Sequence, residues 1–577
     1  MTIPIIMFSR KEGRDESIET APDIENAPIK QPYYITNSHT AMNENKVQEL
    51  QDVVIRFSGD SGDGMQLTGT LFSDTSALLG NGISTFPDYP AEIRAPQGTV
   101  AGVSGFQVHF GAKRQLNPGD FCDVLIAMNP AALKANRKWL KPGATVILDE
   151  DSLTEEHLRK AGFATLDPIR ELNLEDFNVV VPNITEMTKA ALADSGLDNK
   201  AIVKCKNMFA LGICFYLYNR PEDHAKHYLD SKFAKKNPAI AEANKRAIDA
   251  GYNYAANTHQ FANTYTVASG QMEKGTYRSI SGNVATAWGL CAASEKSGLP
   301  LFCGSYPITP ATVILEELAK RKDLGVKTVQ AEDEIAGICT AIGASFAGNF
   351  AVTTTSGPGL SLKSEALGLA VMTELPLVVV DVQRGGPSTG LPTKTEQSDL
   401  SQALYGRNGE CPVIVVAASS PSDCFHYAFE AGRLAMEHMT PVILLTDGFI
   451  ANGSEPWRIP AMKDYPAITP PIVDEAPEGG FMPYVRNENL ARGWAFPGKT
   501  GLEHRVGGLE KDCVKGCISH DPSNHQKMVR TRAEKVAKAV DDIPAQAVWG
   551  APEGDLLVVG WGGTRGHLQN AVDQMRA

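Results

Sequence analysis

The ten cysteines of this chain include no Cys-x-x-Cys pair, and the only close pair is Cys513 and Cys517. An iron–sulfur cluster or a structural zinc ion normally takes four protein ligands at a recognisable spacing. We therefore interpret Cys513 and Cys517 as reduced structural thiols, with metal ligation as the alternative. The chain is expected to hold no metal ion or cluster of its own.

Long apolar runs and an excess of positive charge are missing as well. No run approaches the roughly 20 apolar residues that span a bilayer, and residues 3–8 are too short and badly flanked for a signal peptide. The formal net charge is -13 at pH 7, whereas nucleic-acid binding favours a basic face. We expect no nucleic-acid partner, no membrane association and, by default, a cytoplasmic location.

What is present fits a large α/β protein of several domains. The 577 residues, of which 43% are hydrophobic, are enough for three or more domains with sizeable cores. The composition and pattern predict a polar N-terminal arm (1–50), a first α/β domain (51–235) and a linker (236–281). A second α/β domain (282–470), an irregular excursion with a helix (471–550) and the start of a C-terminal α/β domain (551–577) are predicted to follow.

The last of these segments is expected to begin with a strand at 555–560 followed by a helix from His567. A single strand and one helix cannot bury a core. The pattern therefore suggests a domain that is cut short.

The second α/β domain shows a repeated strand, polar turn and helix. Strands are expected at 301–303, 326–330, 351–355 and 377–382, and helices at 313–318 and 335–346. This alternation predicts a parallel sheet with ligands bound where the strands end.

Three segments lie at these predicted strand ends. Residues 304–310 read Gly-Ser-Tyr-Pro-Ile-Thr-Pro, and the two prolines make a stiff turn. Residues 355–359 read Thr-Ser-Gly-Pro-Gly, and residues 383–394 read Gln-Arg-Gly-Gly-Pro-Ser-Thr-Gly-Leu-Pro-Thr-Lys. An acidic turn at 332–334 precedes the helix at 335–346.

In this order, these segments resemble domain I of the alpha subunit of 2-oxoacid:ferredoxin oxidoreductases, which are thiamine-dependent enzymes. The run 383–394 resembles the 2-oxoglutarate type more than the single-chain pyruvate type. The resemblance covers roughly residue 53 to the C-terminus. It implies that the first domain is a fused gamma-type domain, the second a pyrimidine-binding thiamine domain, and residues 551–577 the start of a transketolase C-terminal-like domain.

The resemblance implies an activating carboxylate at Glu334. In thiamine enzymes, a carboxylate hydrogen-bonds the pyrimidine ring nitrogen, while the cofactor carries the hard chemistry. The alternative is a helix-capping or dipole-stabilising glutamate in a solvated acidic turn.

The resemblance also places substrate and cofactor contacts on the three loops. Thr309 would contact the 2-oxoacid, although it could instead cap the helix expected near residue 311. Arg384 would anchor a carboxylate through its planar fork, with a surface ion pair as the alternative. The remaining candidates are Tyr306, Pro307, Ile308, Ser356 and Gly357 for the cofactor, with a structural turn as the alternative at 356–357, and Ser305, Thr393 and Lys394 for the substrate.

A glycine-rich turn opens the first domain at 57–66, Phe-Ser-Gly-Asp-Ser-Gly-Asp-Gly-Met-Gln. Such a turn before a helix can cradle phosphate, and the resemblance permits a coenzyme A contact here. Its two aspartates argue against a polyphosphate, and a tight turn that needs glycine is the favoured interpretation. The Gly-Asp-Gly at 62–64 imitates a thiamine-diphosphate signature, but Asn81 lies too early to complete it.

We therefore expect the alpha subunit of a 2-oxoglutarate:ferredoxin oxidoreductase, which converts 2-oxoglutarate and CoA reversibly to succinyl-CoA, CO2 and reduced ferredoxin. A beta subunit would carry the diphosphate site, Mg2+ and a 4Fe-4S cluster and share the thiamine diphosphate, in a dimer of heterodimers. The alternatives are the same enzyme acting on pyruvate or branched-chain 2-oxoacids, or a non-catalytic regulatory subunit.

Overall fold

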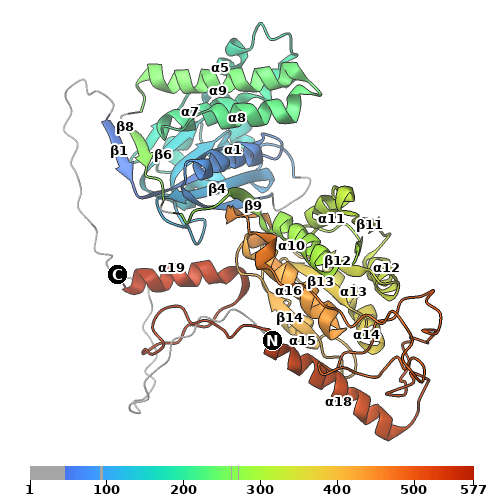
Figure 1. Ribbon diagram of the computed structural model, residues 1–577. Helices are drawn as coiled ribbons and strands as arrows, with labels where there is room; N and C mark the ends of the chain where they lie inside the picture. Colours follow the sequence, from blue (N-terminus) through green and yellow to red (C-terminus); the bar gives the residue numbers. More distant parts are fainter. Residues whose placement is uncertain (1–45, 91–94, 262, 271, 577) are drawn as a thin grey trace.

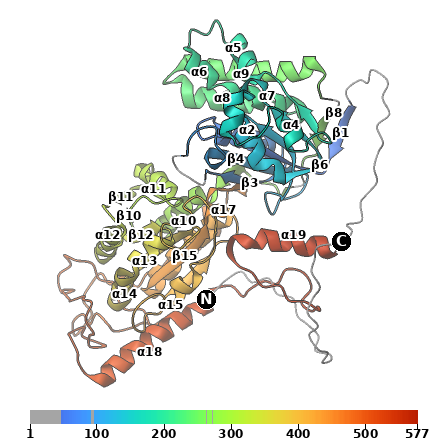
Figure 2. The same ribbon diagram turned by 180° about the vertical axis from the view of Figure 1, so that it is seen from behind.

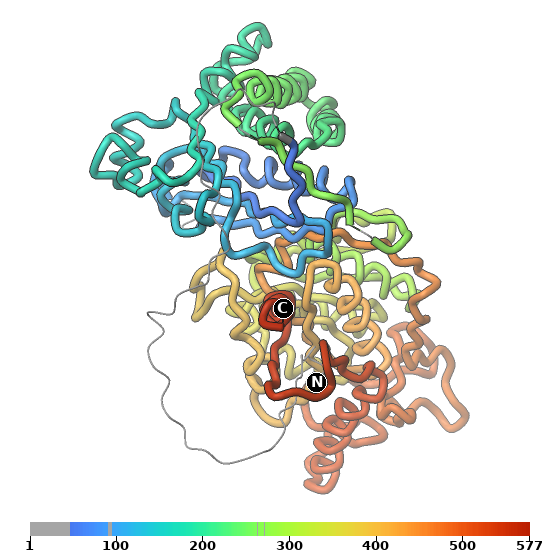
Figure 3. Tube along the Cα trace, turned by 90° about the vertical axis from the view of Figure 1, so that its left-hand side faces the viewer, coloured from blue at the N-terminus to red at the C-terminus, as the bar shows by residue number. Residues whose placement is uncertain are grey.

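The computed structural model describes residues 46–90, 95–261, 263–270 and 272–576. Two α/β domains, each built on a six-stranded sheet, lie one above the other in Figure 1. The side view in Figure 3 separates them by colour, blue to green for the first and yellow to orange for the second. No helix in the described ranges is both long and apolar enough to cross a bilayer.

The first sheet has the strand order β3-β4-β2-β5-β6-β7. Its strands are β2 Asp52–Asp60, β3 Gly82–Asp88, β4 Val103–Gly111, β5 Cys122–Ala127, β6 Leu140–Leu148 and β7 Asn178–Val180. The strands β2, β5, β6 and β7 run parallel, whereas β4 is antiparallel to both β2 and β3. The expected parallel sheet is therefore mixed at one side, because β3 and β4 follow each other without a crossover helix and pair antiparallel.

Helices cover both faces of this sheet. They are α1 Met65–Leu78, α2 Pro130–Asn136, α3 Glu155–Lys160, α4 Pro168–Glu171, α5 Ile184–Ala191, α6 Asn199–Val203, α7 Lys206–Leu217, α8 Asp223–Leu229 and α9 Pro238–Thr258. The helix α7 is buried on nearly all sides, as expected for a segment with few polar residues.

The predicted linker at 236–281 is wrong, because most of it belongs to the first domain. Helix α9 packs on α7 so closely that a methyl group at Gly212 would lie 2.1 Å from the carbonyl oxygen of Ile248. The following strand β8, Asn263–Val267, pairs in parallel with β1, Lys46–Leu50. The alanine-rich face of α9 is what allows this close packing.

The second sheet has the order β11-β10-β12-β13-β15-β14 and is parallel throughout, as predicted. Its strands are β10 Leu301–Ser305, β11 Lys327–Gln330, β12 Phe350–Thr355, β13 Leu377–Gln383, β14 Ile414–Ala417 and β15 Pro441–Asp447. The strand β13 packs Val378, Val380 and Val382 into one core and Leu377 and Val379 into another. Both faces are covered by helices, as an all-parallel sheet requires.

The helices of the second domain follow these strands. They are α10 Gly282–Ser297, α11 Thr312–Ala319, α12 Glu334–Phe346, α13 Gly357–Leu362, α14 Ser364–Thr373, α15 Leu400–Tyr405, α16 Asp423–His438 and α17 Gly448–Asn452. Each helix either starts near the carboxyl end of a strand or packs across the sheet. The loops that carry the predicted site therefore gather at one edge of the sheet.

The two domains contact each other through strands and side chains. The strands β9, Tyr277–Ser281, and β16, Ser454–Arg458, form an antiparallel pair near the junction. The backbone N–H of Ser454 donates to Thr85 Oγ1 at 2.7 Å, and Arg114 pairs with Glu455 at 3.3 Å.

The segment 471–550 was predicted to be an irregular excursion with a helix, and its residues 471–543 pack on the second domain. Its helix α18, Pro522–Lys538, lies along the outside of the domain in Figure 2. The side chain of Trp494 is 1% exposed and donates from Nε1 to the carbonyl of Ser345 at 3.2 Å. The excursion therefore packs on its own chain.

The prediction of a strand at 555–560 is wrong. These residues form no strand, and Leu556 and Val559 are 70% and 58% exposed. The run is apolar enough for a strand, but in the described part of the chain no neighbouring strand pairs with it. The helix α19 that follows spans Arg565–Arg576, so the predicted helix is present.

Candidate functional site

The carboxyl ends of β10, β12 and β13 bring the three predicted loops together, beside the start of α12. The backbone pairing β11-β10-β12-β13 sets this arrangement. We take the loops after β10, β12 and β13 and the first turn of α12 as the candidate site.

Glu334 is the first residue of α12, and its carboxylate is free. The cap of this helix is Asp333, whose Oδ1 accepts the N–H of Ala336 at 2.8 Å. Glu334 is 8% exposed, and its carboxylate forms no hydrogen bond or ion pair with any described residue. The helix-capping role that was the alternative for Glu334 is therefore filled by Asp333.

Gly359 leaves room for the Glu334 side chain. A methyl group at position 359 would lie 2.9 Å from Glu334 Cγ and 1.9 Å from Thr355 Oγ1. The glycine thus lets the loop after β12 lie against the carboxylate. A buried but unpartnered carboxylate suits a ring N–H that arrives with a bound cofactor, so these residues fit thiamine diphosphate.

Lys363 supports Glu334 from behind, a contact that the sequence analysis missed. Its Nζ donates to the carbonyl oxygen of Glu334 at 2.7 Å and to Thr353 Oγ1 at 3.2 Å, and the residue is 0% exposed. Burial lowers the pKa of Lys363 to about 8, although the nearby Glu334 charge opposes this. No pattern in the neighbouring sequence, which also contains Ser361, Ser364 and Glu365, distinguishes this lysine from a solvent-exposed one.

Arg384 joins two of the loops. Its guanidinium donates to the carbonyl of Thr309 at 2.7 Å and to that of Thr389 at 3.1 Å. Arg384 is 6% exposed, and its Nε has no partner among the described residues. Burial lowers the pKa of Arg384, and the nearby Glu334 charge partly offsets this.

Thr309 does not cap a helix. The helix α11 begins at Thr312 with Ala311 at the cap position and no side-chain cap bond. Thr309 itself is exposed at the turn. Its hydroxyl is therefore available to a ligand, and its predicted substrate contact remains a prediction.

The rest of the turn after β10 is divided between surface and core. Tyr306 is 37% exposed, Pro307 is half-buried, and Ile308 packs against the core of the domain. Ser305 is 0% exposed, and its hydroxyl bonds to the carbonyl and the Oγ1 of Thr354 at 2.8 Å each. In the structure, the Ser305 hydroxyl therefore links β10 to the neighbouring strand β12.

The loop after β12 contains a buried hydroxyl without a partner. Ser356 is fully buried, and its Oγ bonds to none of the described residues. Gly357 begins α13 and touches the carboxylate of Asp399, since a methyl group there would lie 2.6 Å from Asp399 Oδ2. An orphan hydroxyl next to tightly packed glycines is more consistent with a binding loop than with a simple turn.

Thr393 and Lys394 contact the first domain. Thr393 Oγ1 donates to the carbonyl of Pro90 at 2.9 Å, and Lys394 Nζ lies 2.8 Å from Asp88 Oδ1. Both side chains are therefore engaged at the domain junction. A cavity of about 510 Å³ opens at the same junction, lined on its apolar side by Phe86, Trp139 and Phe449.

The glycine-rich turn of the first domain matches the favoured interpretation. Gly62 and Gly64 have φ of 111° and 77°, values that favour glycine. Asp63 Oδ2 accepts the N–H of Asp60 at 2.9 Å and closes the turn. The buried Asn81 donates to the carbonyl of Ala268 at 2.8 Å, which is a structural contact.

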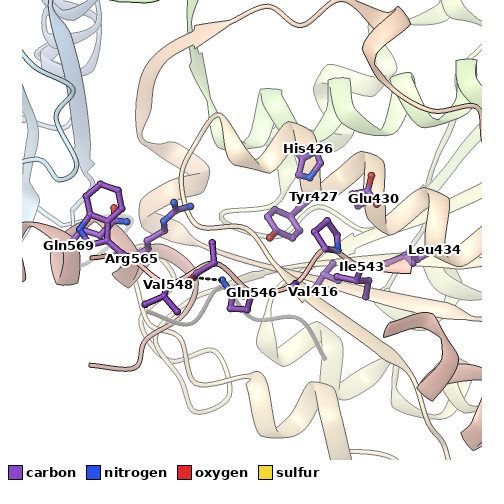
Figure 4. Close-up of a pocket in the computed structure, with 14 residues that line it drawn as sticks. Val416, His426, Tyr427, Glu430, Leu434, Ile543, Gln546, Val548, Arg565 and Gln569 are labelled. Atoms are coloured by element: carbon purple, nitrogen blue, oxygen red, sulfur yellow. Dashed lines mark hydrogen bonds between the residues drawn. The ribbon is translucent and has the colours of Figure 1, made fainter. Parts of the chain in front are cut away.

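A separate cavity of about 300 Å³ lies at the edge strand β14, away from Glu334. Figure 4 shows Tyr427 and Glu430 of α16 on one side of it and Arg565 of α19 on another. The segment that contains Gln546 closes it. None of the predicted site residues lines this cavity.

Comparison with known proteins gives consistent matches over most of the chain. Residues 295–518 match the family described as pyruvate flavodoxin/ferredoxin oxidoreductase, thiamine diP-bdg, and residues 54–254 match pyruvate ferredoxin/flavodoxin oxidoreductase. The chain is 52% identical to the 2-oxoglutarate oxidoreductase subunit KorA of Mycobacterium tuberculosis, over 92% of this chain and 80% of that protein.

Two further relatives point the same way. A 2-oxoglutarate synthase subunit KorA of Methanothermobacter marburgensis is 36% identical over 52% of this chain and 77% of its own length. The solved 2-oxoglutarate:ferredoxin oxidoreductase of Magnetococcus marinus, with 2-oxoglutarate, coenzyme A and succinyl-CoA bound, is 32% identical with a TM-score of 0.76. That match covers 91% of this chain and 86% of the solved one.

Proposed function

Because this chain belongs to the 2-oxoacid:ferredoxin oxidoreductase family, we propose that it is the alpha subunit, with a fused gamma-type domain, of a 2-oxoglutarate:ferredoxin oxidoreductase. The reaction is the reversible oxidative decarboxylation of 2-oxoglutarate with CoA to succinyl-CoA, CO2 and reduced ferredoxin. The observation that carries the proposal is the unpartnered Glu334 carboxylate beside Arg384, in a chain 52% identical to a 2-oxoglutarate oxidoreductase subunit.

Glu334 is assigned to the pyrimidine ring of thiamine diphosphate. When bound, this cofactor supplies the nucleophilic carbon and the electron sink that decarboxylation needs. The chain's part is to hold the Glu334 carboxylate at a fixed place. Asp333 fixes the helix start, and Lys363 holds the Glu334 carbonyl.

Arg384 and Thr309 are assigned to the 2-oxoacid. Arg384 is buried, close to Glu334, and its Nε is unused. A carboxylate that binds beside it gains a charge-assisted hydrogen bond in a site of low solvent exposure. Thr309 presents a free hydroxyl on the loop that Arg384 holds.

Lys394 and Thr393 are kept as supports for the distal carboxylate of a dicarboxylate substrate. Their present partners, Asp88 and Pro90, lie in the first domain. A small rotation of Lys394 would exchange Asp88 for a substrate carboxylate. This would connect substrate binding to the position of the first domain.

Coenzyme A is assigned to the domain junction. The cavity of about 510 Å³ has an apolar wall of Phe86, Pro118 and Phe449, which suits the uncharged pantetheine arm. Its acidic residues, Asp88, Asp120 and Glu396 among them, disfavour the phosphates. The phosphate end would therefore lie outside this cavity.

A beta subunit is assigned the diphosphate, Mg2+ and the 4Fe-4S cluster, with the thiamine diphosphate shared between the chains. The support is the cysteine pattern of the sequence, which has no cluster spacing. Ferredoxin would dock on that beta subunit. The complete enzyme would be a dimer of heterodimers.

The test is turnover by the complex of this chain with its beta subunit, with CoA and an electron acceptor. We expect acceptor reduction with 2-oxoglutarate and little with pyruvate. Preferred reduction with pyruvate would overturn the substrate, and none with any 2-oxoacid would overturn the function in favour of a regulatory subunit.

A further inference from the structure

The loop that carries the substrate anchors has a closed neck. Residues 384–398 leave the end of β13 and return at Asp399, the residue before α15. Gln383 Oε1 accepts the N–H of Asp399 at 3.0 Å, and Gln383 Nε2 donates to the carbonyl of Thr446 at 3.0 Å. The two ends of this anchor loop, which holds Arg384 and Lys394, are thus joined to the sheet at one point.

Two buried carboxyl groups meet at this neck. Asp381 is 0% exposed and Asp399 is 9% exposed, and the two carboxyl groups lie close enough to each other to interact. Neither oxygen of Asp381 nor Oδ2 of Asp399 has a hydrogen-bond partner that the structure places among the described residues. An ionised carboxylate only accepts hydrogen bonds, so a bond between two of them requires a proton.

The surroundings give the pair no positive charge. Asp399 and Asp381 face each other, Glu396 of the loop acts on Asp399, and Asp447 of the neighbouring strand lies beside Gln383 in the sheet. Neither aspartate forms an ion pair with a lysine or arginine of the described chain. Burial raises the pKa of both carboxyl groups; the Asp399 charge adds to the rise at Asp381 and the Glu396 charge adds to the rise at Asp399, whereas the interaction with Asp381 opposes it at Asp399.

Other charged groups nearby are committed elsewhere. Arg384 donates to the backbone of Thr309 and Thr389, and Lys363 donates to Glu334. A shared proton would join one oxygen of Asp381 to Oδ2 of Asp399, and thus pair two of the three orphan oxygens with what the chain itself provides.

Asp399 also touches the predicted cofactor loop. A methyl group at Gly357 would lie 2.6 Å and 2.8 Å from the two carboxylate oxygens of Asp399. The glycine is required for this approach. The carboxyl pair thus contacts the loop after β12 as well as the neck of the anchor loop.

We propose that Asp381 and Asp399 share one proton and act as a clasp that holds the neck of the anchor loop and thereby positions Arg384 beside Glu334. Both are positioning residues, and their effect on catalysis rests on the proposed function. With the proton present, the clasp is closed. Loss of the proton places two negative charges in contact and opens the neck.

The sign of the pH dependence follows from the direction of the shifts. A carboxyl group whose pKa is raised by folding contributes stability that is complete below its ordinary value, 3.8 for aspartate. That contribution is lost as pH rises through the raised pKa. The anchor loop should therefore be best protected in acid and lose protection as the pH rises.

The experiment is amide hydrogen exchange of residues 384–399 in the full chain, followed by mass spectrometry from about pH 6 to about pH 10 and corrected for intrinsic exchange. In the wild type we expect protection to fall at least about tenfold across this range. In Asp381→Asn, the amide donates to Asp399 without a titrating proton, so protection should not vary with pH. Asp399→Asn reverses the partners and should give the same flat profile.

Asp149→Asn is the matched control. Asp149 is a buried aspartate of the first domain that accepts from Thr185 Oγ1 at 2.7 Å, and burial raises its pKa too. This variant should keep the wild-type profile of the anchor loop. A pH-independent wild type, or an unchanged pH dependence in both Asp381→Asn and Asp399→Asn, overturns the clasp.

A second readout separates the clasp from the proposed function. In the complex with the beta subunit, KM for 2-oxoglutarate should rise with pH in the wild type and stay level in Asp381→Asn. If exchange behaves as expected but the complex oxidises no 2-oxoacid, the clasp stands and the proposed function fails. If KM rises equally in both proteins, the clasp does not position the substrate anchors and the proposal fails.

Discussion

The two ends of the second sheet treat buried charge in opposite ways. At the amino end of β13, Glu374 is 1% exposed and fully paired, with Arg486 at 2.6 Å on both oxygens and Lys535 at 2.5 Å. At the carboxyl end, the described residues give the Glu334 carboxylate no hydrogen bond or ion pair, and they place Asp381 beside another acid.

The difference separates stability from function. Burial alone would raise the pKa of Glu374, but Lys535 and Arg486 hold it well below its ordinary value, so the group stays ionised and fixes the excursion to the domain. Buried polar groups without partners are rare in folded proteins, and they concentrate where ligands bind. This contrast supports our proposal that ligands bind at the carboxyl end of the sheet.

Removing the carboxylate at the unpaired end should have the largest effect. Glu334→Gln in the assembled complex should lower kcat on the order of 10³- to 10⁴-fold, because acid–base assistance contributes up to this amount. The free energy of unfolding should hardly change, since Glu334 forms no bond through its side chain. Steady-state turnover and denaturant unfolding measure the two quantities.

Glu332→Gln is the control for that change. Glu332 lies in the same acidic turn but is exposed. It should leave turnover close to the wild type. An equal loss in both variants would show that the charge of the turn, and not Glu334, matters.

A substitution at the paired end should lower the free energy of unfolding instead of the turnover. Glu374→Ala leaves Arg486 and Lys535 buried without their counter-charge, which should lower the free energy of unfolding by about 3–5 kcal/mol. Adding Lys535→Met should recover part of this loss. Urea unfolding checks both changes, and a fully stable Glu374→Ala would refute the assignment of this end to stability.

Arg384→Lys tests the comparison of the two ends further, because Arg384 is a buried charged group at the carboxyl end whose Nε donor is unused. Lysine cannot reproduce the planar fork that reaches Thr309 and Thr389. We expect KM for 2-oxoglutarate to rise about 10- to 100-fold, since hydrogen bonds to charged groups contribute about 1.5–3 kcal/mol. Initial-rate kinetics measure this, and an unchanged KM would remove Arg384 from the substrate site.

Lys394→Met should have the smallest effect. Its ion pair with Asp88 is partly exposed, with side-chain exposures of 38% and 25%, and such pairs contribute about 0–1 kcal/mol. The free energy of unfolding should fall by no more than that amount. A larger loss would show that the domain junction depends on this pair.

Much of this architecture could be predicted from the sequence. The strands of the second domain were predictable because each is an apolar run bounded by turn residues, as at 351–355 and 377–382. The position of Glu334 depended on the family resemblance, since composition alone does not distinguish it from its capping neighbour Asp333. The structure resolves that choice by giving the cap to Asp333.

What the sequence could not give depends on contacts between distant segments. Helix α9 was assigned to a linker because its alanine-rich pattern does not reveal the glycine of α7, Gly212, against which it packs. The run 555–560 was assigned as a strand because strand propensity does not supply a pairing partner. Asp381 was passed over, although a charge inside the apolar strand β13 is itself a signal, whereas Lys363 lies between two helices where the sequence gives no such signal.

The measurement that tests the central claim most directly is exchange of the thiazolium C2 proton of thiamine diphosphate in the complex of this chain with its beta subunit. The comparison is wild type against Glu334→Gln, at equal cofactor occupancy. The account predicts exchange that is slower on the order of 10³-fold in the variant, because the proposed role of Glu334 is to activate the pyrimidine ring. An unchanged exchange rate would contradict the role of Glu334 and, with it, the assignment of the site.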